Sequence, residues 1–387
     1  MSWKESSIMN ERANFVLRVN NGERMTDLCR EFGISRKTGY KIYNRFKDEG
    51  MVGLYDKKRG PKHPHNQVSQ ELQKIILDIK KEYKTWGAKK IRYYLLDKYS
   101  SFNIPANSTI HNILDKHKLV KKKKRRTKFK AIPTHLSKPM RPNDLWCIDY
   151  KGQFKTKDSK YCYPLTITDQ VSRFIIRCEA HESISTKEAI RDCKSAFEEF
   201  GLPRAIRSDN GVPFSTRTIW GLSELSLLWL RLGIKIERIQ PGQPQQNGRH
   251  ERMHRTLKQE TTRPARSNIF QQQESFDLFK ETFNNDRPHE AIRMNTPSKL
   301  YYNSLNKYEG VPELDYSDCE LKHKVSNCGA ISVKGKKFYL SEAFRGQSLG
   351  FNEEDDNIYS VYFMHYQLGF VDLESKRLSI LDSPFKI

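Results

Sequence analysis

The sequence lacks several features that mark common classes of protein. Its seven cysteines are scattered over 387 residues without a CxxC pair, which is typical of reduced thiols and not of a disulfide framework or a zinc module. The longest apolar stretch, residues 222–232, is interrupted by Glu224 and Arg231, so no membrane span is predicted. The first residues contain no apolar segment of a signal peptide. We therefore expect a cytoplasmic protein with no membrane partner.

Acidic residues are scarce in the first third of the chain. Residues 1–142 hold 34 Lys and Arg against 13 Asp and Glu, so they carry +21 of the total net charge of +23. Residues 143–387 hold 35 against 33, a net charge of +2. A basic front on a nearly neutral body indicates an anchoring region for a polyanion. Nucleic acid is the first candidate; an acidic membrane surface is the second, but no basic amphipathic helix with a broad apolar face supports it.

Helical periodicity dominates this basic front. Apolar residues from Met25 to Phe32 follow a helical spacing, Gly33 ends that helix, and Ser35 caps a second helix that Gly50 closes. Two short helices with such a turn are typical of a helix-turn-helix, which we assign to residues 1–55; the alternative is a plain three-helix bundle with a solvated basic face. The side chains expected to contact DNA are Arg36, Lys37, Tyr40, Lys41 and Arg45.

A second helical unit and a basic linker complete the front. Residues 66–120 resemble a second, winged-type helix-turn-helix, in which Ser108 is expected to cap the third helix. The linker, residues 121–142, begins with eight basic residues in ten, including Arg125 and Arg126. Such a run neutralises several phosphates with little sequence preference, so these two arginines are expected to bind DNA.

The pattern then changes to alternating strands and helices, which predicts a mixed α/β sheet covered on both faces. A nearly continuous apolar strand at 145–150 contains Asp149, and a short strand at 205–206 leads into Asp209. Glu251 lies in the first turn of a later helix. Further elements expected here are strands at 162–167 and 174–176, which make the strand at 205–206 the fourth, a capped helix from Ser185 to Gly201, a helix at about 219–232 and a strand at 234–239.

Each of these three acids taken alone fits a turn, a helix cap or a surface charge. Taken together, Asp149, Asp209 and Glu251 can meet at one rim if the first and fourth strands are neighbours. Three converging carboxylates repel one another unless hard divalent cations lie between them. Oxygen ligands suit Mg²⁺ or Mn²⁺, and two such ions ~4 Å apart promote phosphodiester chemistry.

These motifs resemble the integrase core of DDE transposases, in the branch of bacterial insertion sequences related to retroviral integrases. The likeness covers residues 143–305, and the motifs that carry it are Trp146-Cys147-Ile148-Asp149, Ser208-Asp209-Asn210-Gly211, residues 241–248, residues 251–258 and Asn284-Asn285-Asp286-Arg287-Pro288-His289. It implies a ribonuclease H-like fold with a mixed five-stranded sheet, in which the three acids are the catalytic metal ligands. Lys258 matches a basic position that the family uses against DNA, and Arg255 shares its helix face.

Two departures from the family pattern matter. Asp209 and Glu251 are separated by 41 residues, against the 35 usual in this branch, and we expect the addition to lengthen a helix within residues 216–230. The N-terminal zinc module of retroviral integrases is absent, since His63 and His65 have no cysteine nearby, so we predict no zinc. Residues 310–387 are predicted to form a small β-barrel with a hairpin at 330–340, serving DNA contacts, protein contacts or structure alone.

The resemblance implies a transposase that binds the terminal inverted repeats of its element and works as a homo-oligomer on double-stranded DNA. It would cleave DNA with two Mg²⁺ or Mn²⁺ ions and transfer the resulting 3′-OH to target DNA. The alternatives are a non-catalytic DNA-binding regulator derived from a transposase, and a simple nuclease on the same fold.

Overall fold

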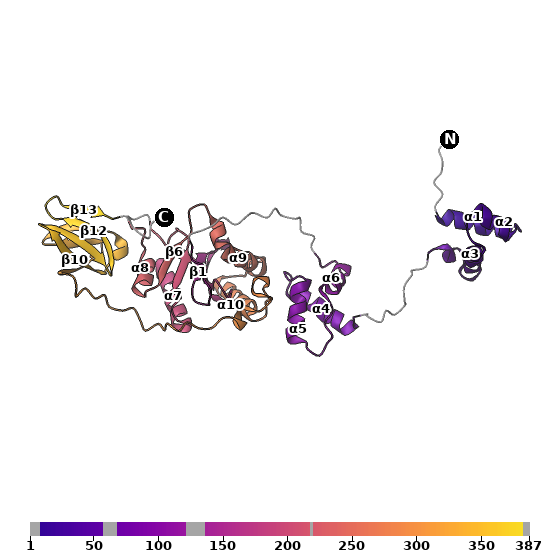
Figure 1. Ribbon diagram of the computed structural model, residues 1–387, viewed down its shortest axis with the longest axis horizontal. Coiled ribbons are helices and arrows are strands. Elements are labelled where there is room, and N and C mark those ends of the chain that lie inside the picture. Colours follow the sequence, from indigo (N-terminus) through magenta and orange to yellow (C-terminus); the bar gives the residue numbers. More distant parts are fainter. Residues whose placement is uncertain (1–7, 57–67, 121–135, 217–219, 382–387) are drawn as a thin grey trace, which may run out of the picture. The chain divides into compact units, whose positions relative to one another are not determined.

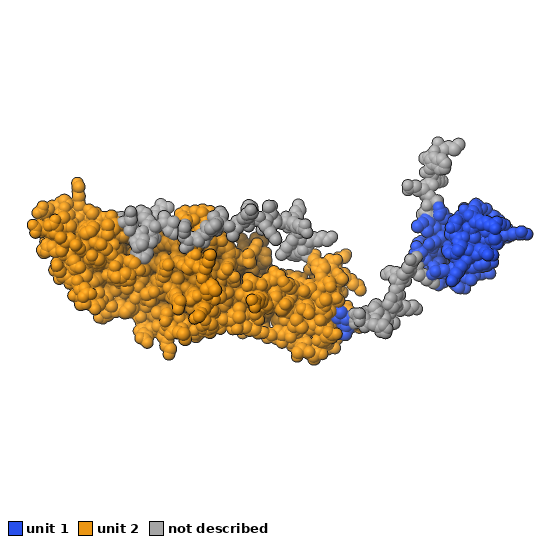
Figure 2. All heavy atoms as spheres, viewed as in Figure 1, with its two compact units in different colours: residues 1–69 blue, residues 70–387 orange. Residues whose placement is uncertain are grey.

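The computed structural model describes residues 8–56, 68–120, 136–216 and 220–381. The chain divides into two compact units, residues 1–69 and residues 70–387 (Figure 2). Each unit is described by itself. Arg125 and Arg126, with the rest of the basic run, lie outside the described residues.

The first unit is a bundle of three helices. Its elements are α1 (Ile8–Asn20), α2 (Met25–Glu31), α3 (Arg36–Glu49) and a 3₁₀ turn (Gly50–Leu54) (Figure 1). Ser35 caps α3 as predicted, because its hydroxyl accepts a hydrogen bond from the Thr38 amide. Gly39 is buried where α3 crosses α2, and a Cβ there would lie 2.6 Å from the Cys29 sulfur. The close approach of the two helices therefore requires glycine.

The second unit begins with three more helices. They are α4 (Gln70–Glu82), α5 (Ala88–Lys98) and α6 (Asn107–Lys116). Two details of the prediction are wrong. Ser108 does not cap α6, because the helix already begins at Asn107 with Ala106 in the N-cap position. The described residues of 68–120 form no strand, so they contain no wing.

Helices α4–α6 contact the central domain through polar groups. Lys89 pairs with Glu290 at 2.6 Å, Lys98 pairs with Asp286 at 3.5 Å, and Lys299 pairs with Asp97. Exposed ion pairs of this kind contribute little stability each. Together, these three ion pairs nevertheless fix the position of helices α4–α6 against the central domain.

The central domain is built on the predicted mixed sheet. Its strands are β1 (Trp146–Tyr150), β2 (Phe154–Lys155), β3 (Tyr161–Asp169), β4 (Ile175–His181), β5 (Ala205–Ser208) and β6 (Lys235–Arg238). Five of them run in the order β4-β3-β1-β5-β6, and the two-residue β2 pairs with β3. Strands β3 and β4 are antiparallel partners, whereas β5 is parallel to both β1 and β6.

Helices cover both faces of this sheet. They are α7 (Thr186–Phe200), α8 (Glu224–Arg231), α9 (Gly248–Thr261) and α10 (Ile269–Asn285). One apolar cluster joins α7 and α8 to β1 through Phe197, Trp229 and Trp146. A second cluster joins α9 and α10 to β3 and β4 through Leu257 and Phe276. Since α9 packs directly on the sheet, its first turn is held at a fixed place relative to the strands.

Two central elements differ in length from the prediction. Strand β4 has seven residues, against the three expected at 174–176. Helix α8 begins at Glu224, so it is shorter than the helix expected at 219–232. Gly221 has a φ of 65°, and the side chain of Ser223 caps the helix by accepting from the Ser226 amide. Left-handed backbone and a cap both end helical structure, so this segment does not lengthen α8.

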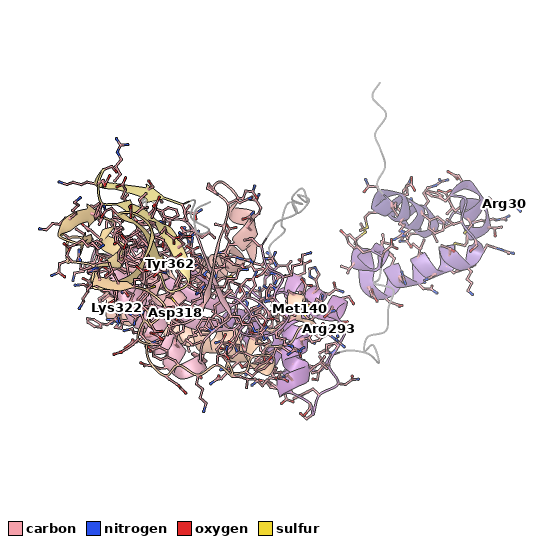
Figure 3. The ribbon with its side chains drawn as sticks, turned by 60° about the vertical axis from the view of Figure 1, so that its left-hand side comes forward. Arg30, Met140, Arg293, Asp318, Lys322 and Tyr362 are labelled. Atoms are coloured by element: carbon pink, nitrogen blue, oxygen red, sulfur yellow. The ribbon has the colours of Figure 1, made fainter. Side chains whose placement is uncertain are left out.

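The C-terminal domain is an open antiparallel sheet and not the barrel we predicted. Its strands are β7 (Leu321–Lys324), β8 (Ala330–Val333), β9 (Lys336–Tyr339), β10 (Ser348–Asp355), β11 (Ile358–Phe363), β12 (Tyr366–Asp372) and β13 (Arg377–Ile380). The order β13-β12-β11-β10-β7 leaves β13 and β7 at opposite edges, while β8 and β9 form the predicted hairpin. Lys322 and Tyr362 lie on the two neighbours of β10, both opposite Gly350 (Figure 3).

This sheet shares its apolar core with the central domain. Trp220 is 2% exposed, packs edge-on to Phe344, and donates its indole N–H to the carbonyl of Leu368 at 2.9 Å. Leu227 and Leu230 of α8 belong to the same cluster. Trp220 and Leu222, which lie between Asp209 and α8, therefore form part of the C-terminal domain's core. None of the described helices is long and apolar enough to cross a membrane.

Candidate active site

The strand register brings the first two acids together. Strands β1 and β5 pair in parallel with Cys147 opposite Arg207. Asp149 and Asp209 follow these residues by two positions each, so continuing the register sets the two acids side by side at the carboxyl ends of neighbouring strands. We expected the first and fourth strands to be neighbours, and the pairing confirms it.

The third acid is positioned by a hydrogen-bond network between α9 and β3. His250 and His254, on either side of Glu251, each place Nε2 near the Thr166 hydroxyl oxygen, at 2.7 and 2.6 Å. Thr166 lies opposite Asp149 in the β1–β3 register and donates to its backbone carbonyl at 3.1 Å. The start of α9 is therefore attached to the sheet beside Asp149.

The electrostatics of Asp149 indicate that the three acids converge. The pKa of Asp149 is raised to about 7, by burial first and then by the nearby carboxylates of Asp209 and Glu251, against an opposing effect of Lys151 that is smaller than that of Asp209. Burial also raises the pKa of Asp209, opposed by a hydrogen bond from the Gly211 amide and by Arg238. Three ionised carboxylates at this site would repel one another, so binding of a positive charge is favourable there.

The hydrogen-bond network supports the same conclusion. Both histidines are buried, and burial lowers their pKa values, to about 3 for His250 and well below the usual range for His254. With the neutral His254 donating from Nε2 to Thr166, its Nδ1 is an acceptor. That atom faces the Asp149 carboxylate at 3.7 Å. Two acceptors facing one another fit a cation between them, and the ligand atoms of Asp149, His250 and His254 lie within 4.8 Å of each other.

These histidines and Thr166 were not singled out from the sequence as site residues. The only available signal was their spacing, with His250 and His254 four residues apart on one helix face around Glu251. That His254, Arg255 and Lys258 share the face of Glu251 was expected, but the structure divides them by burial. His254 is buried, whereas Glu251, Arg255 and Lys258 are exposed.

The other predicted DNA contacts lie elsewhere. Arg36, Lys37, Tyr40 and Lys41 are exposed around the first turns of α3, and Arg45 is half-buried. They belong to the first unit, whereas the three acids belong to the second. Arg255 and Lys258 are on α9 with Glu251.

Comparison with known families follows the same division of the chain. Residues 139–244 and 232–297 match models of the integrase core domain. Residues 11–62 match a helix-turn-helix domain, and residues 38–114 match a homeodomain-like domain. Residues 322–379 match the C-terminal domain of IS481 family transposases.

Known proteins are similar over parts of the chain. An uncharacterized 39.2 kDa protein of insertion element IS476 from Xanthomonas euvesicatoria is 22% identical over 61% of this chain and 66% of its own length. A Gag-Pol polyprotein of baboon endogenous virus is 31% identical over 32% of this chain and 7% of its own length. The HTLV-2 integrase catalytic core, solved in complex with magnesium, has 16% identity and a TM-score of 0.34 over 43% of this chain and 100% of its own. The chain thus spans less than two thirds of these curated relatives.

The mixed sheet, its covering helices and the matched domains define an integrase core of the DDE polynucleotidyl transferase superfamily. Helix-turn-helix domains precede this core and a transposase C-terminal domain follows it. The chain thus combines helix-turn-helix domains, an integrase core and a domain that matches the C-terminal domain of IS481 family transposases, and parts of it are similar to an insertion-element protein and to a retroviral polyprotein.

Proposed function

We propose that this transposase binds the terminal inverted repeats of its insertion sequence, cleaves DNA there and joins the resulting 3′-OH to target DNA. Asp149, Asp209 and Glu251 are its catalytic acids. The observation that supports the proposal is the β1–β5 pairing, whose register, extended by two positions, would set Asp149 beside Asp209, together with the carboxylates that raise the pKa of Asp149.

The donor set fits divalent metal ions. The oxygens of Asp149, Asp209 and Glu251 would hold two Mg²⁺ or Mn²⁺ ions, since hard cations prefer carboxylate oxygen. Such ions supply Lewis-acid chemistry, by which an attacking oxygen is activated and a leaving oxygen stabilised. We propose no zinc for this chain.

The side chains around the acids would orient the DNA. Arg255 and Lys258 are exposed on α9 within two turns of Glu251, where they would hold phosphates next to the scissile bond. The hydrogen bonds of Thr166 with the two histidines hold α9 at a fixed position against β3. Water and then the 3′-OH are the nucleophiles, so no side chain needs to form a covalent bond to DNA.

The basic front would select the DNA. Arg36, Lys37, Tyr40, Lys41 and Arg45 of the first unit would contact the element ends, and the basic run with Arg125 and Arg126 would add phosphate contacts. Two ends must meet before joining, so we propose a homo-oligomer as the active assembly. Its relatives in bacterial insertion elements suggest that it acts on the nucleoid of a bacterial cytoplasm.

Substitution of each acid tests the assignment. We expect Asp149→Asn, Asp209→Asn and Glu251→Gln each to abolish cleavage and strand transfer, because an amide is a poor ligand for a divalent cation. Binding to the ends should survive, since the helix-turn-helix domains are untouched. The measurement is a joining assay with labelled element ends, a plasmid target and Mg²⁺, run beside a gel-shift assay.

The exposed Glu274→Gln on α10 is the control, and it should behave as wild type. Strand transfer at the wild-type rate in any of the three variants would refute the assignment. With the wild-type protein, joined products support a transposase, whereas nicks alone indicate a nuclease and binding without either indicates a regulator.

A further inference from the structure

A second feature of the central domain is a basic cavity of about 850 Å³ beside α9. We call it the basic cavity; its cationic lining residues are Lys90, Arg173, Arg249, Arg252, Arg255 and Arg287. They come from the start of α5, the β3–β4 turn, α9 and the segment after α10. None of the three acids lines it. The basic cavity is therefore a separate site on the same helix that carries Glu251.

The positive charge of the basic cavity is largely uncompensated. Its two acidic lining residues are engaged elsewhere, since Asp169 accepts hydrogen bonds from Asn143 and Ser172, and Glu290 pairs with Lys89. Arg287 pairs with Glu260 at 2.7 Å. Among the described residues, the other five cations have no carboxylate partner within 4 Å.

Electrostatic repulsion between the cations of the basic cavity lowers the pKa values of two of them. The pKa of Arg173 is lowered to about 10, by burial first and then by the neighbouring Arg249 and Arg252. Burial and then Arg287 lower the pKa of Lys90 to about 7. Gathering like charges in a partly buried place costs free energy unless a counter-charge is present.

A buried donor atom in the basic cavity, Nη1 of Arg173, lacks a hydrogen-bond partner. Nε2 of His289 is also without a partner, but burial lowers the pKa of His289, so this nitrogen of the neutral ring is not counted as a donor. The His289 side chain is held by packing of its ring against Phe283, with centroids 4.5 Å apart. Unsatisfied buried polar atoms are uncommon, and here they line a space rich in cations, which suits an oxygen-rich anion.

We propose that the basic cavity binds backbone phosphates of DNA. The inference deepens the proposed function, on which it rests for the presence of DNA. Guanidinium groups match phosphate oxygens with paired hydrogen bonds, and three of the cations, Arg249, Arg252 and Arg255, lie on α9, which also carries Glu251. Lys90 adds a contact from α5, which lies within the homeodomain-like match. Phosphates in the basic cavity would thus be held jointly by a DNA-binding domain and the catalytic domain.

The test removes charge from two walls of the basic cavity. Lys90→Gln, Arg252→Gln and the double variant of the full chain are titrated with a labelled 40-base-pair duplex in EDTA, over a range of KCl concentrations. Each lost phosphate contact should weaken binding roughly tenfold at 0.1 M salt and reduce the slope of log K against log salt by ~0.9. In the double variant, the magnitude of the slope of log K against log salt should therefore be smaller by about two than in the wild-type protein.

Controls of equal charge are available outside the basic cavity. Lys74→Gln on α4 and Arg266→Gln after α9 each remove one exposed cation. They should change the slope much less, and thermal melting should show that all variants are folded. A wild-type slope in the double variant, or an equal loss in both controls, would overturn the proposal. Because EDTA removes chemistry from the readout, failure of strand transfer would not affect this result.

A second measurement distinguishes DNA from a small anion. Pyrophosphate binding to the wild-type protein is followed by calorimetry, with and without saturating duplex. We expect the duplex to abolish the pyrophosphate signal that depends on Lys90 and Arg252. A signal that persists at full strength in the presence of duplex would mean a site for free phosphate compounds, and the proposal would fail.

The dependence on pH gives a third readout. Lys90 faces Arg287, His289, Glu260 and Glu290, and its pKa is about 7 without a ligand. A bound phosphate stabilises the charged amine and raises this pKa, so binding takes up a proton above pH 7. Duplex affinity should therefore fall more steeply from pH 7 to 9 for the wild-type protein than for Lys90→Gln. Equal pH profiles would contradict the role of Lys90.

Discussion

At the scale of single residues, one hydroxyl determines where the start of α9 lies. Thr166 joins two histidines of α9 to the backbone of Asp149, and its contacts with both histidines are buried. Its neighbour Thr168 contacts Nδ1 of His250 at 2.8 Å, so the imidazole is satisfied on both sides. Thr166 is thus a positioning residue for the acids and does not itself belong to the proposed metal ligands.

Removal of this hydroxyl should uncouple α9 from the sheet. In Thr166→Val the nitrogens of His250 and His254 lose their shared partner, and each buried unsatisfied group costs about 1–3 kcal/mol. We expect a lower melting temperature and a loss of strand transfer of at least tenfold. Thr156→Val is the matched control, because this buried hydroxyl bonds to Lys160 and Asp158, away from α9. Equal activity in the two variants would exclude a positioning role.

The acids were predictable from the sequence, but their supporting residues were not. Asp149 interrupts an apolar strand and Asp209 follows one, so local patterns mark both. Thr166 contacts His250 across 84 positions of the chain, and no local pattern encodes such a pair. The basic cavity was missed for the same reason, since its lining joins Lys90 to Arg287.

At the scale of elements, α9 presents different chemistry on its different faces. Met253 and Leu257 pack on the sheet side, Glu251 is near the other acids, and Arg252 lines the basic cavity. The helix that was expected to carry Glu251 in its first turn is present as α9. The prediction of α8 was wrong in its start, because residues 220–222 are apolar for a different purpose, namely packing against the C-terminal sheet.

Removal of Trp220 should loosen the C-terminal sheet. The indole is 2% exposed and hydrogen-bonded to Leu368, so Trp220→Ala leaves a cavity and an unpaired carbonyl. Such a truncation costs about 3–5 kcal/mol. We expect faster hydrogen exchange in β10–β12 and earlier proteolytic cleavage of this domain. Phe270→Ala, which removes a 78% exposed aromatic ring, should leave both unchanged. Similar protection in both variants would argue against a shared core.

At the scale of the whole molecule, charge and contacts divide the chain differently. The charge changes at about residue 142, whereas the first compact unit ends at residue 69. Among helices α4–α6 the basic excess lies on α5, and this helix pairs with the central domain through Lys89 and Lys98. Sequence composition predicted a separate front because charge is a local property, while the ion pairs join residues about 200 positions apart.

Two truncations should distinguish the structural boundary at residue 69 from the change in charge at residue 142. A chain without residues 1–69 should keep the melting transition of the remaining body, because that unit has its own core. A chain without residues 1–142 should lose all end-specific binding, since both helical domains are gone. Gel shifts with the element ends and with an unrelated duplex measure this. End-specific shifts by the shorter protein would refute the assignment of recognition to the basic front.

Trp220 also limits how relatives of this protein could be recombined. Because Trp220, Leu227 and Leu230 complete the core of the C-terminal sheet, a boundary drawn at residue 310 would divide one folding unit. A chimera that exchanges only residues 310–387 would pair a foreign sheet with an unmatched indole. Exchange of residues 216–231 together with the sheet would keep the two surfaces matched. Among relatives, the sequence of residues 216–231 should therefore vary together with the sequence of the C-terminal domain. It should vary less closely with the sequence around Asp209 and Glu251, although these acids flank it.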